Sequence, residues 1–313
     1  MRDIHAAFFT EAGRSRGMGH LIRSFAISRE LQSLGVKISF FLDSDISFDE
    51  KFKGITYFSW DQFNLLDDYD IVFIDSYEAD IGIYLQVSHS CKVAVYLDDF
   101  KRLDYPKGVI LNFAPDADVL FYKDKKEGFH YLLGLEYLPI RSEFASVKRT
   151  KRDQLFIMLG GSDTANLSLD MADALKDIKV KKVIVSNNVD TVNLLSKYLD
   201  VEVLYKPSDE QLIKTMASSS LAISTASMSA YELAYLKIPT IITAVAENQE
   251  TGALQFVKHN LSNGFVSIKG DSWKADVQSK IRSMLGRKSF HIDNAIDGNG
   301  VSNIATEVLK LAQ

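Results

Sequence analysis

Short apolar runs rich in β-branched and aromatic residues alternate with helical patterns in the first half of the chain. The runs that predict strands cover residues 4–9, 36–42, 71–75, 93–97 and 109–113. An apolar helix pattern over residues 21–34 follows the first of them. Alternation of this kind is typical of βαβ units, which build a parallel sheet.

The same pattern restarts in the second half. Predicted strands cover residues 155–159, 183–186, 201–205, 221–224, 240–243 and 265–268. Predicted helices cover residues 166–176, 210–217, 229–236 and 249–259, and a last one covers 303–311. Ser208 and Asp209 open the second of these helices as an N-cap, and Pro239 follows the third.

A polar stretch at residues 147–153 separates the two halves. We therefore predict an α/β protein with two Rossmann-like domains, residues 1–147 and 153–300, and mostly parallel sheets. Residues 301–313 form a terminal helix, for which a place on the first domain is one possible arrangement. Ligands of such folds bind outside the carboxyl ends of the strands, so the expected site is a cleft between the domains.

The composition narrows the class of protein. The chain has 313 residues, of which 46% are hydrophobic, and a net charge of −5, without the basic patch of a nucleic-acid binder. Its one cysteine, Cys91, allows neither an intrachain disulfide nor a cysteine-based metal site, and we expect it to be buried. No run approaches the ~20 apolar residues of a membrane span, and no signal peptide opens the chain, so the expected location is the cytoplasm.

The segment Gly17-Met18-Gly19-His20 lies between the first predicted strand and the first predicted helix. Glycines let backbone N–H groups approach an anion closely, and a helix N-terminus carries about half a positive charge. The same field disfavours imidazolium, so we expect His20 to be neutral and able to accept a proton. The alternative is a histidine that caps its own helix. The glycines lack the spacing of the dinucleotide fingerprint, which argues against an NAD enzyme.

Three turns of the second half also suit anions or hydroxyl groups. The segment Gly160-Gly161-Ser162 is either an anion-binding turn or a tight strand–helix connection. A hydroxyl-rich turn at residues 224–229 leads to Glu232, a carboxylate that either accepts two ribose hydroxyls or caps the helix. Asn248 begins a further helix, as a donor to phosphate oxygens or as an N-cap.

Two acidic segments end strands of the first half. They are Ile74-Asp75-Ser76-Tyr77 and Leu97-Asp98-Asp99, and both are expected to face the cleft. Neither has metal-ligand spacing with histidines, so we predict no metal site. For Asp98 and Asp99, a solvated strand end is expected in preference to a Mg²⁺ site.

Taken in order, these turns resemble the UDP-2,4-diacetamido-2,4,6-trideoxy-β-L-altropyranose hydrolases of pseudaminic acid biosynthesis. The matching motifs are Gly-x-Gly-His at 17–20, Gly-Gly-Ser-Asp at 160–163, the serine-rich turn with its glutamate, Glu-Asn-Gln at 247–249 and Asp-Gly-x-Gly at 297–300. The resemblance covers nearly the whole chain. That family is related to the GT-B glycosyltransferases, which include the peptidoglycan transferase MurG, so the resemblance implies a GT-B fold.

The resemblance also implies a role for each matching residue. His20 would be the general base for water attack on a UDP-sugar with inversion, and Tyr77 an active-site tyrosine. The substrate-binding residues that it implies are Gly17, Gly19, Arg23, Arg141, Gly160, Gly161, Ser162, Ser229, Glu232 and Asn248. Among them, Glu232 would bind the ribose and Asn248 the pyrophosphate. No cofactor is implied, and other enzymes of the same sugar pathway are candidate partners.

The segment before the glycine turn departs from the family. The family has Arg-x-Asp-x-Ser there, where this chain has Phe9-Thr10-Glu11-Ala12-Gly13, and Arg16 stands where an apolar residue is usual. Glu11 is the candidate replacement for the aspartate. The reaction class is therefore better supported than the identity of the sugar. An inverting GT-B glycosyltransferase and a non-catalytic nucleotide-sugar-binding protein remain as alternatives.

Overall fold

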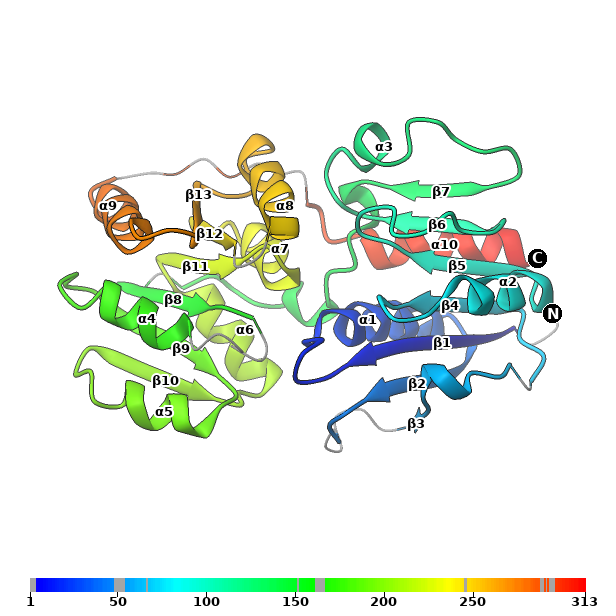
Figure 1. The fold of residues 1–313 in the computed structure, drawn as a ribbon, viewed down its shortest axis with the longest axis horizontal. Coiled ribbons are helices and arrows are strands. Elements are labelled where there is room, and N and C mark those ends of the chain that lie inside the picture. The colour runs from blue at the N-terminus through cyan, green and yellow to red at the C-terminus, as the bar shows by residue number, and fades with distance from the viewer. Residues whose placement is uncertain are drawn as a thin grey trace. The chain divides into compact units, whose positions relative to one another are not determined.

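The computed structural model describes residues 4–47, 54–65, 67–150, 152–160, 167–244, 247–287, 290, 292 and 296–313. The chain divides into two compact units, Met1–Arg141 with Asp297–Gln313, and Ser142–Ile296. Each unit is a parallel sheet with helices on both faces, which confirms the predicted α/β class (Figure 1). The boundary follows Arg141 and so precedes the predicted stretch 147–153. Residues 297–300, predicted to end the second domain, are part of the first unit.

The sheet of the first unit has seven strands within the described residues, in the order β3-β2-β1-β4-β5-β6-β7. They are β1 (His5–Ala12), β2 (Lys37–Ser44), β3 (Ile55–Tyr57), β4 (Ile71–Asp75), β5 (Val93–Leu97), β6 (Val109–Asn112) and β7 (His130–Leu133). All neighbouring pairs are parallel. The chain runs outward from β1 to β3 and then places β4 on the other side of β1. The strand order therefore reverses between β1 and β4, which is the switch point of the sheet.

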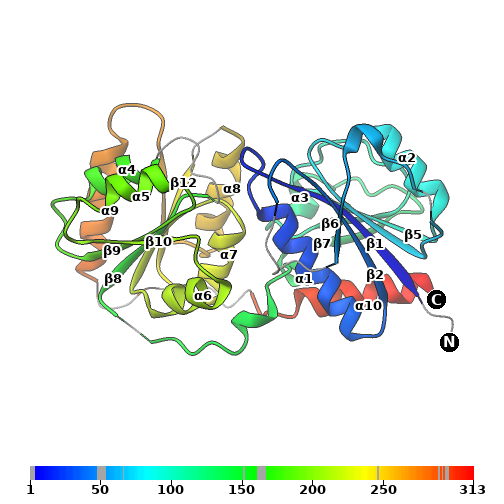
Figure 2. The same ribbon diagram turned by 90° about the horizontal axis from the view of Figure 1, so that it is seen from below.

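Helices cover both faces of this sheet. They are α1 (Gly19–Ser33), α2 (Ile81–Ser90), the single turn α3 (Ala117–Leu120) and α10 (Gly300–Ala312). Leu21 of α1 and Ile304 of α10 share one buried core with Phe8 and Phe73 of the sheet. Tyr84 of α2 belongs to the core on the opposite face (Figure 2). The terminal helix thus completes the first unit.

The sheet of the second unit repeats this plan with six described strands in the order β10-β9-β8-β11-β12-β13. They are β8 (Gln154–Met158), β9 (Lys181–Ser186), β10 (Val201–Tyr205), β11 (Leu221–Thr225), β12 (Thr240–Ala244) and β13 (Gly264–Ser267). The helices are α4 (Leu167–Ala174), α5 (Val189–Leu195), α6 (Asp209–Ser218), α7 (Met228–Tyr235), α8 (Glu247–Lys258) and α9 (Trp273–Leu285). Here the order reverses between β8 and β11.

Several elements follow directly from local sequence. The predicted N-cap is confirmed, because the hydroxyl of Ser208 accepts a hydrogen bond from the backbone N–H of Gln211 at 3.2 Å. The pattern missed α2, whose second residue Gly82 is a poor helix former, although Asp80 caps it at Ile83. It also missed β3, β7, α3, α5 and α9.

Cys91 is half-buried, and burial raises the pKa of its thiol to about 11. Within the described residues, every helix is too short or too polar to cross a bilayer.

Candidate active site

The candidate base lies at the switch point of the first sheet. Thr10 of β1 pairs with Asp75 of β4 in the parallel register. The helix α1 begins at Gly19, shortly after β1 ends, so His20 stands at a helix N-terminus beside the carboxyl end of β4. Parallel α/β sheets bind their ligands at this position.

His20 is held by the carboxylate of Asp75. The distance from Nδ1 of His20 to Oδ1 of Asp75 is 2.6 Å, and both side chains are buried. Nη2 of Arg23 also lies 3.0 Å from Nδ1, but Asp75 is the nearer partner. Because an ionised carboxylate only accepts hydrogen bonds, we assign the proton to Nδ1, which leaves Nε2 to accept one. The cap position of α1 is Met18, which makes no side-chain capping bond. The helix-capping alternative for His20 is therefore wrong, because its imidazole bonds to the neighbouring strand.

Arg23 bridges two carboxylates next to His20. Its Nε and Nη2 donate to Asp75 at 2.7 and 2.6 Å, and its Nη1 and Nη2 donate to Asp99 at 2.7 and 3.0 Å. Burial by itself would raise the pKa of both carboxyls, but the charge of Arg23, its hydrogen bonds and the neighbouring His20 together outweigh burial and hold each pKa below its usual value. Burial would likewise lower the pKa of Arg23, and the two carboxylates raise it instead. All three groups therefore stay charged at neutral pH.

The geometry shows an internal role for Arg23, whose substrate-binding role stays a prediction. Only 5% of the surface of Arg23 is exposed, and its guanidinium donates hydrogen bonds to both carboxylates. The side chain also lies over the ring of Phe113, with 5.4 Å from the guanidinium carbon to the ring centroid. Arg23 is thus an internal clamp in this structure.

Tyr77 contacts Asp99 and His20, which both lie beside Arg23. Its hydroxyl donates to Oδ2 of Asp99 at 2.5 Å, and its ring meets the imidazole of His20 edge to face, with 4.4 Å between centroids. Burial of the hydroxyl and then the charge of Asp99 raise the pKa of Tyr77, so the phenol is neutral. The residue as a whole remains 47% exposed and lies 5.5 Å from the ring of Phe100. The structure thus places Tyr77 beside His20, and its role as an active-site tyrosine stays a prediction.

Asp98 differs sharply from its neighbour Asp99. It is buried, so the expected solvated strand end is wrong for this residue. Its carboxylate accepts hydrogen bonds from the backbone N–H groups of Lys101 and Arg102 and from the side chains of Tyr105, Asn112 and Tyr122. These bonds fix the turn that presents Asp99 to Arg23. Within the described part of the chain, no group of three His, Cys, Asp or Glu side chains is placed to hold a metal ion.

The predicted glycines shape the loop before α1. Gly17 has a φ of +72°, a left-handed conformation that disfavours other residues, and it exchanges two backbone hydrogen bonds with Gly13, at 3.1 and 2.9 Å. No atom lies within 4 Å of the place that a Cβ on Gly19 would occupy. The backbone at the start of α1 is therefore open to the close approach of a ligand.

The candidate residues of the second unit also gather at a switch point. Gly160 follows β8 with a φ of +96° and open space around it. The hydroxyl of Ser229, in the first turn of α7, contacts the sulfur of Met158 at 3.4 Å. The hydroxyl of Ser224, at the end of β11, is buried without a hydrogen-bond partner among the described residues. Polar groups therefore lie together at the carboxyl ends of the neighbouring strands β8 and β11.

The remaining predicted substrate-binding residues are buried or lie outside the described part of the chain. Glu232 is 2% exposed and lies within α7, and Arg141 is buried at the last residue of the first segment. Gly161 and Ser162 lie outside the described residues. Asn248 is the second residue of α8, and its side chain also lies outside the described part.

In the sequence, Asp75 and Asp99 stand out only as acidic residues at the ends of predicted strands, with a Mg²⁺ site as the alternative for Asp99. The signal that could have found them is their common position, because Asp75 is the last residue of β4 and Asp99 follows the end of β5 by two residues in the same parallel sheet. Carboxylates at that edge are placed to meet a histidine and an arginine on the first turns of α1. Which carboxylate meets which partner is decided by the strand order.

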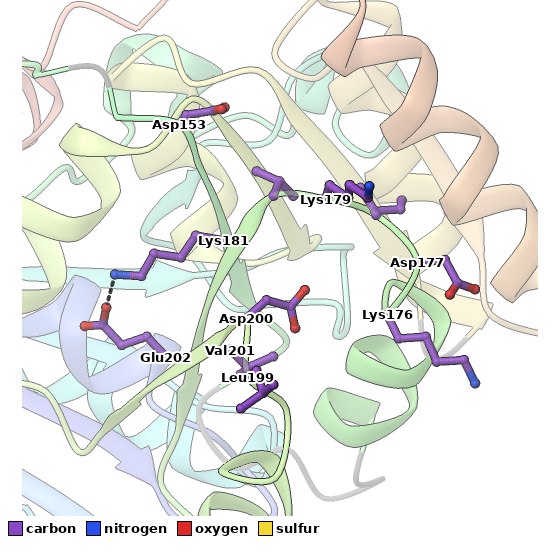
Figure 3. A pocket seen from close by; sticks show the side chains of 11 residues that line it. Asp153, Lys176, Asp177, Lys179, Lys181, Leu199, Asp200, Val201 and Glu202 are labelled. Carbon is purple, nitrogen blue, oxygen red and sulfur yellow. Dashed lines mark ion pairs between the residues drawn. The ribbon is translucent and has the colours of Figure 1, made fainter.

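A pocket of about 840 Å³ lies at the amino-terminal ends of strands in the sheet of the second unit. Figure 3 shows that its lining comes from residues at and before the starts of β8, β9 and β10. Lysines and carboxylates alternate around it, and Lys181 pairs with Glu202 at 2.5 Å. Ligands of parallel sheets bind at the carboxyl edge, so this pocket is not part of the candidate site.

Comparison with known proteins agrees with the motifs. No protein-family profile matches the chain. It is 24% identical over 251 residues to the Helicobacter pylori pseudaminic acid cytidylyltransferase and UDP-2,4-diacetamido-2,4,6-trideoxy-β-L-altropyranose hydrolase, which covers 77% of the chain and 44% of that protein. It is 31% identical over 130 residues to the Campylobacter jejuni UDP-2,4-diacetamido-2,4,6-trideoxy-β-L-altropyranose hydrolase, which covers 40% of the chain and 47% of that protein.

A solved structure shows the fold. MurG of Acinetobacter baumannii matches with a TM-score of 0.62 at 14% sequence identity, over 98% of the chain and 99% of MurG. The chain spans about half the length of the curated relatives it matches. The resemblance that the motifs indicated is therefore confirmed: the chain is related to proteins named as UDP-2,4-diacetamido-2,4,6-trideoxy-β-L-altropyranose hydrolases, and its fold is that of the MurG-like GT-B proteins.

Proposed function

We propose that this chain hydrolyses a UDP-linked sugar, with His20 as the general base that activates a water molecule. The observation that carries the proposal is the 2.6 Å bond between Nδ1 of His20 and Asp75, which leaves Nε2 as the proton acceptor. The relatives named as UDP-sugar hydrolases support this reaction class.

The charges around His20 suit that role. Asp75 and Asp99 carry two negative charges and Arg23 one positive charge, so the three side chains have a net charge of −1. When Nε2 takes a proton from water, the imidazolium that forms faces a negative cluster. Asp75 both orients the ring and stabilises that imidazolium, as the aspartate of a serine-protease triad does.

The second unit is proposed to bind the nucleotide. The backbone at Gly160 and the hydroxyl of Ser229 at the start of α7 offer donors to phosphate oxygens, and the sequence motif adds Gly161 and Ser162 to this proposed site. The motifs support Glu232 as the ribose ligand and Asn248 as the pyrophosphate ligand, and Arg141 as a further substrate contact. Donors aimed at the pyrophosphate stabilise the charge that grows on UDP as it leaves. Water attack opposite to UDP inverts the anomeric carbon.

The names of the relatives support a UDP-linked diacetamido-trideoxy sugar of pseudaminic acid biosynthesis as the substrate. Other enzymes of that pathway are then the proposed partners, and the cytoplasm is the proposed location. Nucleic acid has no place in this proposal, because the net charge of −5 is unfavourable for it.

The test is incubation of the purified chain with the UDP-linked diacetamido-trideoxy sugar in the absence of any acceptor. We expect UDP and free sugar to appear in equal amounts, with the inverted anomer formed first, as followed by NMR. Replacement of His20 by Gln keeps the size of the side chain and removes the base, so we expect turnover to fall by about 10²- to 10⁴-fold.

The other outcomes separate the alternatives. Release of UDP only after addition of an acceptor sugar would identify a glycosyltransferase, and binding of the UDP-sugar without turnover would identify a non-catalytic binding protein. Full activity of the His20→Gln variant would exclude His20 as the base. We expect activity to persist in a metal chelator, since no step of the proposal uses a metal.

A further inference from the structure

Glu11 lies in the segment that departs from the family pattern, and it is almost completely buried. It is 1% exposed near the end of β1. Its Oε2 accepts hydrogen bonds from Nε1 of Trp60, at 2.9 Å, and from the hydroxyl of Ser76, and its Oε1 accepts from the backbone N–H of Tyr77 at 2.8 Å. A carboxylate so enclosed does not reach a substrate, and all its bonds point into the first unit.

The turn that Glu11 holds is the one that carries Tyr77. The hydroxyl of Ser76 donates to Glu11 and accepts from the backbone N–H groups of Glu78, at 2.9 Å, and Ala79, at 2.8 Å. Arg16 supports the same turn from outside, because its Nε donates to Glu78 at 2.8 Å. The two unusual residues of the departing segment, Glu11 and Arg16, therefore bind the same turn.

Tyr77 depends on these bonds for its position. Nearly half of its surface is exposed, so packing alone does not hold it. Its backbone N–H is fixed at Glu11, and its hydroxyl is fixed at Asp99. Between those two ends, its ring lies against the imidazole of His20.

We propose that Glu11 is a positioning residue, which fixes the turn at residues 76–79 so that Tyr77 keeps its contacts with Asp99 and His20. The effect on turnover rests on the proposed function, whereas the effect on Tyr77 does not. A carboxylate is needed because all three groups that face Glu11 are donors. A glutamine would turn its own N–H groups toward at least one of them and leave that buried donor without an acceptor.

The test compares Glu11→Gln with Trp60→Phe. The second variant also removes a bond to Glu11 but leaves the bond to Tyr77 in place. Tyrosine labelled with ¹³C at Cζ reports ionisation of each phenol by NMR, and the Tyr77→Phe spectrum assigns the signal. In the native chain and in Trp60→Phe we expect the Tyr77 signal to be unchanged up to about pH 11. In Glu11→Gln we expect it to titrate near the ordinary value of about 10, because the hydroxyl leaves Asp99.

Turnover of the UDP-linked sugar gives a second readout. We expect Glu11→Gln to lower kcat by about 10- to 100-fold with little change in KM, because it displaces a group beside the base. Trp60→Phe should stay within about threefold of the native kcat.

A folded Glu11→Gln variant with a native Tyr77 titration would overturn the proposal. If that variant does not fold, amide exchange in the native chain decides: the Tyr77 amide must be strongly protected although it lies outside any helix or strand, and rapid exchange would refute the proposal. If the native chain hydrolyses no UDP-sugar, a shifted Tyr77 titration in Glu11→Gln still supports the positioning role while the proposed function fails.

Discussion

The charges of Arg23, Asp75 and Asp99 depend on one another because Arg23 and Asp75 are buried and Asp99 is only partly exposed. Arg23 is shared by Asp75 and Asp99, and it alone among these three carries a positive charge. Loss of one partner from such a buried group leaves the others without compensation, which costs more than the intact group contributes. At the scale of single residues, the site is therefore sensitive to substitutions that barely change shape.

The pH dependence of stability follows from this charge pairing. The pKa of Asp75 in the folded chain is held below its unfolded value of about 3.9. Its ionised form therefore stabilises the fold above about pH 4, and that contribution is lost as the pH falls toward the folded pKa. We expect Asp75→Asn to lower the free energy of unfolding at pH 7 by about 3–5 kcal/mol.

Urea unfolding at several values between about pH 7 and pH 3 tests this expectation. The difference between the native chain and Asp75→Asn should narrow below about pH 4, where the carboxyl of the unfolded chain takes up a proton while the folded chain still keeps it ionised. A difference that stays constant over the whole range would show that Asp75 acts by packing and not by charge.

At the scale of elements, the ends of strands and helices carry both the structure and the chemistry. β1 and β4 end beside each other and bring the first turn of α1 to Asp75. In the second unit, β8 and β11 end beside each other and present Gly160 and Ser224. Three helices, α2, α5 and α6, begin with a side-chain cap that the local sequence specifies, and these caps are separate from the candidate site.

Ser208 offers a test of such a cap. Its hydroxyl accepts from the backbone N–H of Gln211 at the start of α6, so Ser208→Ala should lower the free energy of unfolding by about 1 kcal/mol. Ser272, in the corresponding position before α9, makes no capping bond, so Ser272→Ala should have a smaller effect. Urea unfolding measures both variants. If both variants lost the same free energy of unfolding, the hydrogen bond at Ser208 would contribute nothing to stability.

At the scale of the whole molecule, each unit has its own buried core. The last helix belongs to the first unit, where Ile304 of α10 meets α1 and the sheet. Ile223 of β11 lies in the core of the second unit. Both side chains are fully buried. Stability is therefore divided between the two units, and α10 covers part of the core of the first.

Paired substitutions test this division. Ile304→Ala and Ile223→Ala should each cost about 2–5 kcal/mol, because each leaves a cavity in a packed core. Hydrogen exchange should show faster opening of β1, β4 and β5 in Ile304→Ala and of β8, β11 and β12 in Ile223→Ala. Faster exchange of both sheets in either variant would mean that the two cores unfold together.

Much of the fold could be read from local pattern. Fully buried strands such as β4, β5, β11 and β12 appear as short apolar runs between polar turns, and the cap at Ser208 is visible in the sequence. Elements with weak local signals, such as α2 with its early Gly82, were missed because their stability comes from packing. The place of His20 between a strand and a helix was likewise available from periodicity alone.

The partners of that histidine were not. His20 and Asp75 are 55 residues apart, and only the reversal of strand order between β1 and β4 makes them neighbours. The adjacent residues Asp98 and Asp99 look alike in the sequence, yet one is enclosed by five donors and the other faces Arg23. The sequence by itself determined the elements and the residue types at their ends, because both depend on near neighbours along the chain. Tertiary structure decided which charges meet, because burial and hydrogen bonding depend on neighbours in space.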